Sequence, residues 1–291
     1  MSVKTTIREK LAPDKDSTEP VEDARRSRAP ALPSPRGQAA RAVMPRVLLI
    51  APPILLALFL LASWFLAYRH VSNLILPAPG NVFSALTSGI ASGLFLSNAL
   101  VTIEESLLGF ALALVIALPL GYGIAKWRLF SATVQPYLAA GQAIPAIVIF
   151  PLLNLWFGYG LITIVILCML VVLFPVVITI ALGFQTIDSS LVDAARVEGA
   201  AGWSMLAHIE FPLALPAILA AIRTGLTLSI VGAIVGEFIN QGDQGLGSLV
   251  LSARNQFDSA LLFATLFFMA IMATLYYGFA WALTKLANRI Y

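Results

Sequence analysis

The sequence predicts an all-α, polytopic membrane protein with about six transmembrane helices. Of its 291 residues, 59% are hydrophobic and only 11% are charged, whereas soluble domains carry about 25% charged residues. Its apolar runs are close to the roughly 20 residues that a helix needs to cross a bilayer, and they are longer than barrel strands require. The single cysteine, Cys168, lies inside such a run. It excludes an intrachain disulfide and a multi-cysteine metal site, so we interpret it as a small apolar residue.

Residues 1–45 are polar, carry mixed charges and several prolines, and contain few apolar residues from which a core could form. This composition predicts a disordered tail on the cytoplasmic side. A cleaved signal peptide would place its apolar run much nearer to Met1 and end it with small residues, and the sequence has neither feature there. We therefore expect the tail to be retained.

Residues 46–74 are predicted to hold the first transmembrane helix and the start of an external loop. The helix covers about Val47–Tyr68, close to the length that a bilayer requires. Trp64 and Tyr68 fall at its outer end, where aromatic side chains are favoured at the membrane interface. The loop that follows, Arg69–Asn98, is mixed in composition.

Residues 75–291 are predicted to form the remaining core of the protein. Its transmembrane helices are expected at about 102–125, 134–157, 161–183, 217–237 and 261–283. Pro145 and Pro151 interrupt the second of these runs. Small residues such as Gly109 in the first run favour close helix packing in lipid. The glycine-rich and polar segment Phe238–Asp258 is expected to form a re-entrant or surface loop.

A polar and charged segment, residues 188–216, separates two of these apolar runs. Such a segment must lie in water, and several of its residues suit a docking surface. An acid such as Asp193 is favoured at a helix N-terminus, and the small Ala194 and Ala195 let a partner surface come close. Gly199 can adopt a positive φ and turn the chain between two short helices.

The end of this segment and its internal spacing carry a more specific signal. Pro212 and Pro216 are expected to stop the second short helix and to start the next span. The spacing resembles the EAA loop of bacterial ABC-importer permeases, whose pattern is E-A-A-x3-G-x9-I-x-L-P. The matching residues are Asp193, Ala194, Ala195, Gly199, Ile209, Phe211 and Pro212. Asp193 replaces the glutamate and Phe211 replaces the leucine, and both keep the chemistry of the position. The alternative is an ordinary polar loop.

The resemblance implies a type I ABC-importer permease fold and a set of partners. In that family the loop forms short cytoplasmic helices that dock on a separate ATPase subunit, which binds ATP and Mg²⁺. Two copies of this chain would form the pore in the membrane lipid, and a periplasmic or extracellular binding protein would deliver the substrate. The chain itself has no G-x-x-x-x-G-K-[ST] phosphate loop. We therefore expect no cofactor, metal or catalytic residue on it.

Two stretches resemble particular branches of that family. Residues Pro145–Gly160 (PAIVIFPLLNLWFGYG) are similar to permeases for nitrate, sulfonates and taurine. Residues Asp243–Leu266 are similar to permeases for thiamine pyrimidine precursors or for riboflavin. The resemblance implies a small polar organic molecule or anion as substrate, with the pyrimidine precursor or riboflavin preferred.

The distribution of basic residues predicts the orientation in a bacterial inner membrane. Ten Lys or Arg residues lie between Met1 and Arg46, and most of the others fall in the turn at residues 126–128, in the polar segment and at the C-terminus. The positive-inside rule then places both termini and the polar segment in the cytoplasm. The net charge of +3 does not indicate a nucleic acid partner.

Ionisable residues inside apolar runs are candidates for a transport pathway, because burying them in lipid is costly. The candidates are Arg223, Glu237 and Glu104, with Glu105 beside Glu104, and Gln142 adds a polar group. For each there is a simpler interpretation. The two adjacent glutamates could sit in water at the outer interface, Glu237 could likewise be interfacial, and Arg223 could extend to the inner surface.

Two other functional classes fit this sequence less well than an ATP-driven importer. An ion-coupled secondary transporter often shows internal repeats or broken helices around an ion site, and no paired halves are visible in this sequence. It would also leave the segment 188–216 unexplained. A membrane enzyme would need clustered polar catalytic residues at one depth, and the sequence does not show them.

Overall fold

The computed structural model describes residues 46–240, 242 and 244–290, and all the regular elements in this part of the chain are helical. The predicted all-α class is confirmed. The elements are α2 (Arg46–Ala67), α3 (Pro79–Ala91), α4 (Leu94–Lys126), α5 (Arg128–Ala143), α6 (Ala146–Phe157), α7 (Leu161–Gln185), α8 (Ser189–Val197), α9 (Gly202–Met205), the π-helical turn η2 (Leu206–Glu210), α10 (Phe211–Asn240), α11 (Leu246–Asn255) and α12 (Ser259–Ile290). The predicted tail, residues 1–45, lies outside the described residues.

Four helices in the described part are long and apolar enough to cross a membrane: α4, α7, the continuous helix Gly202–Asn240, and α12. The pair α5 and α6 adds a fifth span if it crosses as one bent unit. The apolar helix α2 is 22 residues long. The described part of the chain thus supports four to five of the roughly six predicted spans, because the apolar part of α2, Ile54–Ala67, is shorter than the others.

The span predicted at 134–157 is not one helix, and the structure corrects that expectation. It consists of α5 and α6, which meet at a bend of 98°. The break lies at Ile144 and Pro145, both of which have extended backbone angles. Proline lacks an N–H to continue the helical hydrogen bonds and disfavours the helical conformation of the residue before it. Pro151, in contrast, lies inside α6.

Several predicted boundaries also need correction. The external loop predicted at Arg69–Asn98 contains α3 and the start of α4, which begins at Leu94 rather than near residue 102. The segment Phe238–Asp258 contains α11 instead of forming only a loop. Hydropathy marks the part of a helix that suits lipid, whereas helical hydrogen bonding continues past that part into polar sequence.

The centre of the bundle is α7, which packs against both α4 and α10. Close approach depends on small residues. A Cβ atom added to Gly109 of α4 would lie 2.2 Å from Cβ of Cys168, and one added to Gly232 of α10 would lie 3.0 Å from Cα of Cys168. Cys168 is fully buried between these glycines. Its interpretation as a small buried residue is confirmed, as is the expected packing role of Gly109.

Replacing Gly109 with leucine is therefore expected to lower the free energy of unfolding by about 2 kcal/mol, since overpacking forces helices apart. Thermal unfolding of the purified chain in detergent would measure the change. Gly278→Leu in α12 is the matched control, because a Cβ at Gly278 meets no atom within 4 Å. Equal stability of the two variants would contradict the close packing of α4 on α7.

Candidate functional site

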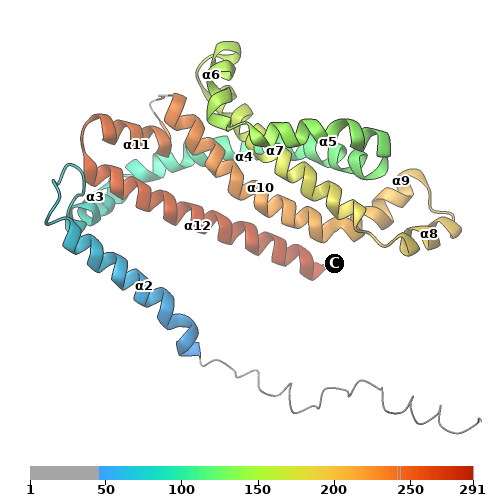
Figure 1. Cartoon of the computed structure of the whole chain (residues 1–291), viewed down its shortest axis with the longest axis horizontal. Helices are drawn as coiled ribbons and strands as arrows, with labels where there is room; N and C mark the ends of the chain where they lie inside the picture. The colour runs from blue at the N-terminus through green and yellow to red at the C-terminus, as the bar shows by residue number, and fades with distance from the viewer. Residues whose placement is uncertain (1–45, 241, 243, 291) are drawn as a thin grey trace, which may run out of the picture. The chain divides into compact units, whose positions relative to one another are not determined.

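The segment 188–216 folds into the short helices α8 and α9 and the turn η2, at the end of the bundle opposite α3 and α11 (Figure 1). The first helix is capped by Asp188, whose side chain accepts a hydrogen bond of 2.9 Å from the Ser190 N–H. This bond favours the charged carboxylate and lowers the pKa of Asp188. Asp188, which sequence reasoning did not single out, thus occupies the position expected for Asp193.

Asp193 lies in the interior of α8, so its predicted place at a helix start is wrong. Its carboxylate is exposed and pairs with Arg196 of the same helix at 2.9 Å. Surface pairs of this kind contribute little to stability. The carboxylate therefore remains accessible to a partner molecule.

Gly199 ends α8 with a φ of +94°, so the predicted positive φ is confirmed. Two hydrogen bonds close the turn: the Ala200 N–H donates to the Ala195 carbonyl at 2.9 Å, and the Gly199 N–H donates to the Arg196 carbonyl at 3.0 Å. This is the Schellman arrangement, in which glycine avoids the steric cost of a left-handed conformation. No atom lies within 4 Å of a Cβ added to Gly199, so the turn is open on that side.

The prolines at the end of the segment were expected to interrupt the helix, but they do not. Pro212 lies in the first turn of α10 and Pro216 inside it, and the helix runs without interruption from Gly202 to Asn240. The π-helical turn η2 immediately precedes them, with the Phe211 N–H bonded to the Leu206 carbonyl. The change of hydrogen-bond register in a π turn accommodates a following residue that has no N–H. The short helix and the span are thus one continuous element.

Four of the seven motif residues meet in one cleft of about 340 Å³: Ala194, Ala195, Ile209 and Pro212. The others lie outside its lining, with Asp193 exposed, Phe211 partly exposed and Gly199 at the turn. Beyond the cleft, two large apolar side chains of the segment face outward, Val197 at 90% and Trp203 at 78% exposure. Large apolar side chains that are exposed within a polar segment are typical of a protein contact surface.

One buried residue of this segment was missed in the sequence. Glu210 is only 5% exposed, and its carboxylate accepts bonds from Lys126 Nζ at 2.5 Å and Tyr122 Oη at 3.1 Å. Both partners lie in the last turns of α4. The signal available in the sequence was an acid between the apolar residues Ile209 and Phe211, with no indication of its partner.

Among the pathway candidates, Glu237 is buried inside the protein and does not sit in water. Its carboxylate accepts a hydrogen bond of 2.6 Å from the Thr102 hydroxyl and another of 2.6 Å from the Gly247 N–H. A Cβ added to Gly245 would lie within 2.4 Å of this carboxyl group, and Gly245 has a φ of +107°. Only glycine allows the chain to pass so close in that conformation.

The same network holds the N-terminus of α11. Its free N–H groups would be unsatisfied in a buried setting. Asn98 accepts from the Gly245 N–H at 2.8 Å, and Thr102 accepts from the Leu246 N–H at 3.0 Å. Sequence reasoning missed Asn98 and Thr102, although two polar residues four apart in a span lie on one helix face.

The adjacent glutamates of α4 have different environments. Glu104 is exposed, whereas Glu105 is 4% exposed. The expectation that both sit in water is wrong for Glu105, because successive residues of a helix point in directions about 100° apart. Within the described part of the chain, Oε2 of Glu105 has no hydrogen-bond partner.

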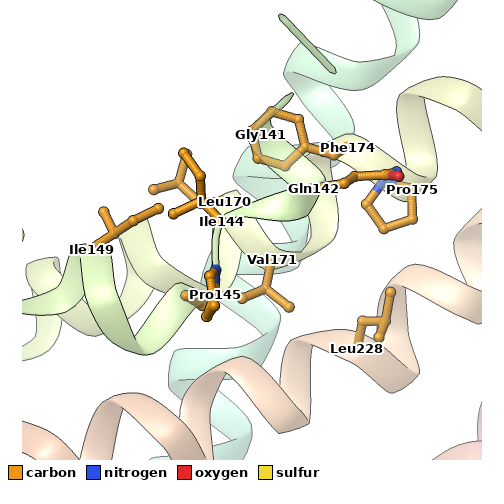
Figure 2. Close-up of a pocket in the computed structure, with 11 residues that line it drawn as sticks. Gly141, Gln142, Ile144, Pro145, Ile149, Leu170, Val171, Phe174, Pro175 and Leu228 are labelled. Carbon is orange, nitrogen blue, oxygen red and sulfur yellow. The ribbon is translucent and has the colours of Figure 1, made fainter. Parts of the chain in front are cut away.

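The two remaining pathway candidates lie apart from this network. The guanidinium of Arg223 lies over the ring of Tyr277 in α12, 4.4 Å from its centroid, which is a favourable cation–π contact. Gln142 lines a cavity of about 450 Å³ at the bend between α5 and α6. Figure 2 shows it among apolar residues that include Phe174, Pro175 and Leu228, and its amide is the polar side chain of this lining.

Comparison with known proteins agrees with this architecture. The chain is 40% identical over 215 residues to the riboflavin transport system permease protein RibX of Chloroflexus aurantiacus, covering 74% of this chain and 80% of that protein. It is 28% identical over 237 residues to the formylaminopyrimidine transport permease protein ThiX of Halalkalibacterium halodurans, covering 81% and 93%. The fold is similar to a structure of the MetNI methionine ABC transporter, with a TM-score of 0.60 at 18% identity, covering 67% of this chain and 96% of that one.

A family match settles the relationship. Residues 113–290 match the family described as binding-protein-dependent transport system inner membrane component. The matched region contains α7, the segment 188–216 and α10, the elements that build the candidate site. The chain is therefore a multi-pass inner-membrane protein that belongs to this family of ABC transporter permeases.

Proposed function

We propose that this chain is the permease subunit of an ATP-driven importer, and that the segment 188–216 receives the movement of a separate ATPase subunit. The observation that carries the proposal is the surface of this segment. The cleft of Ala194, Ala195, Ile209 and Pro212 lies beside the open turn at Gly199. Exposed Val197 and Trp203 offer apolar anchors of the kind enriched in protein interfaces.

The proposed partners follow from the family. An ATPase subunit would bind ATP and Mg²⁺ and dock at this cleft, a binding protein would deliver the substrate from outside, and a second copy of the chain would complete the pore. The chain would act as a transport subunit, with hydrolysis on the partner. Both termini and the segment 188–216 would face the cytoplasm. The basic residues Lys126, Arg128 and Arg196 support this orientation, because basic residues are enriched on the cytoplasmic side of membrane proteins.

The continuity of α9, η2 and α10 supports the proposed mechanism. A displacement of the short helix by the ATPase would be passed directly to the span, because the helix is continuous from Gly202 to Asn240. Closure of the ATPase pair would thereby switch the spans between inward and outward access, a transition between two packed arrangements.

The substrate we propose is riboflavin, with a formylated aminopyrimidine as the next choice. The 40% identity to a riboflavin permease and the 28% identity to a formylaminopyrimidine permease support this order. The cavity beside Gln142 offers an amide among apolar walls, which suits a planar heterocycle with polar edges. Arg223, Glu237 and Glu104 remain weaker proposals for the pathway.

The test is uptake by the assembled transporter. The chain would be co-expressed with the ATPase and binding protein encoded beside it, and reconstituted into vesicles with Mg-ATP inside the compartment that the ATPase faces. Riboflavin uptake, followed by its fluorescence, is expected to require ATP, and riboflavin is expected to stimulate ATP hydrolysis. Stimulation by the pyrimidine, a sulfonate or nitrate instead would reassign the substrate. Uptake driven by an ion gradient through this chain alone would overturn the importer.

A further inference from the structure

An ion pair between residues far apart in the sequence joins the segment 188–216 to α4. Glu210, the last residue of η2, accepts from Lys126 Nζ at 2.5 Å, and the two residues are 84 positions apart. Tyr122, one turn earlier in α4, donates to the second carboxylate oxygen at 3.1 Å. The ring of Phe184 in α7 meets the Tyr122 ring edge-on, with centroids 5.2 Å apart.

The environment of this pair differs from that of a surface ion pair. The Glu210 side chain is 6% exposed and that of Lys126 is 35% exposed. A buried carboxylate is destabilising unless it is paired and hydrogen-bonded, and here both its oxygens have partners. Lys126 is also the last residue of α4, where the helix dipole favours a cation. The exposed pair of Asp193 and Arg196 joins neighbouring turns of a single helix.

The position of Glu210 gives the pair mechanical significance. It lies where the π-helical turn passes into α10. A movement of α9 therefore reaches α10 directly along the chain, through η2. The hydrogen bond between Thr102 and Glu237 joins α4 and α10 at their opposite ends. Near the segment 188–216, apolar contacts between the two helices resist separation but allow sliding. A directional bond resists sliding as well, because its strength depends on distance and angle.

We propose that Glu210 is a positioning residue that makes α4 and α10 move together when the segment 188–216 is displaced, with Lys126 and Tyr122 as its partners. The inference rests on the proposed ATP-driven transport. In this proposal, the bridge sets how much substrate is transported for each ATP hydrolysed. The bridge does not contact the ATPase, which is proposed to dock at the cleft of Ala194, Ala195, Ile209 and Pro212.

The test is to measure uptake and ATP hydrolysis in the same vesicles for Glu210→Gln and Tyr122→Phe. Glu210→Gln is close in shape and keeps an acceptor but loses the charge, and we expect roughly a five- to tenfold fall in substrate transported per ATP. ATP hydrolysis is expected to continue, because the docking cleft is unchanged. Tyr122→Phe, which removes one bond, is expected to give a smaller fall in the same ratio.

Controls separate this role from a purely structural one. The exchange Lys126→Glu with Glu210→Lys restores an opposite-charge pair and is expected to recover most of the ratio, whereas Lys126→Glu alone is not. Arg128→Gln removes an exposed charge near the same end and is expected to leave the ratio unchanged. Equal loss of hydrolysis and uptake without rescue by the exchange, or an unchanged ratio in Glu210→Gln, would overturn the inference. Absence of ATP-dependent uptake in the parent protein would instead refute the proposed function.

Discussion

Replacement of Gly199 by aspartate is expected to impair transport strongly while the chain still inserts and folds. Gly199 has a φ of +94°, and a side chain in this conformation costs about 1 kcal/mol. That cost is small for the whole bundle, and no steric clash adds to it, because no atom lies within 4 Å of the added Cβ. The new carboxylate, however, would stand on the turn between α8 and α9, on the surface proposed to receive the ATPase.

The expected result is a fall in ATP-dependent uptake of about tenfold or more, equivalent to a loss of ~1.4 kcal/mol or more in docking. Co-purification of the ATPase subunit with the tagged chain would measure docking directly. Gly93→Asp is the matched control, since Gly93 also has a positive φ of 76° and an open Cβ position, at the start of α4. If both variants transport equally well, the segment 188–216 is not the docking site.

Glu237→Ala is expected to have the largest effect on stability. The change leaves the Gly247 N–H and the Thr102 hydroxyl without their shared acceptor in a buried site. Hydrogen bonds to a buried carboxylate contribute about 1.5–3 kcal/mol each, so we expect a loss of about 3 kcal/mol in the free energy of unfolding. Faster hydrogen exchange in α11 would localise the damage, because its N-terminus depends on this network.

The neighbouring substitution Glu104→Ala serves as the control, because Glu104 is exposed and is expected to change stability little. The pair of variants also distinguishes two roles for Glu237. A stable Glu237→Ala protein that fails to transport would place this carboxylate in the substrate pathway. A destabilised protein with fast hydrogen exchange in α11 would show that Glu237 mainly holds α11 in place.

The parts of this protein that were predictable from the sequence depend on local patterns. Long apolar runs indicate helices that cross a bilayer, because a spanning backbone must satisfy its own hydrogen bonds. The spacing from Asp193 to Pro212 indicated the permease family, to which the chain belongs, and Gly199 was correctly expected at a turn of positive φ. Helix bounds were less accurate, and the 98° bend at Pro145 was interpreted as an interruption within one span.

The electrostatic contacts of the site could not be read in the same way. Glu210 and Lys126 are 84 residues apart, and Glu237 meets Thr102 across 135 residues. Whether Glu104 or Glu105 is buried depends on how α4 is rotated against its neighbours, and apolarity all around a span leaves that rotation unspecified.

The chain order of hydrophobic and polar residues was therefore sufficient for the all-α membrane class and for the place of the polar segment 188–216 between two apolar runs, since each rests on interactions within a few turns. The partners of Glu210 and Glu237 emerged only from the packing of α4, α10 and α11. A buried charge acquires its role from the groups brought against it, and those groups come from other helices.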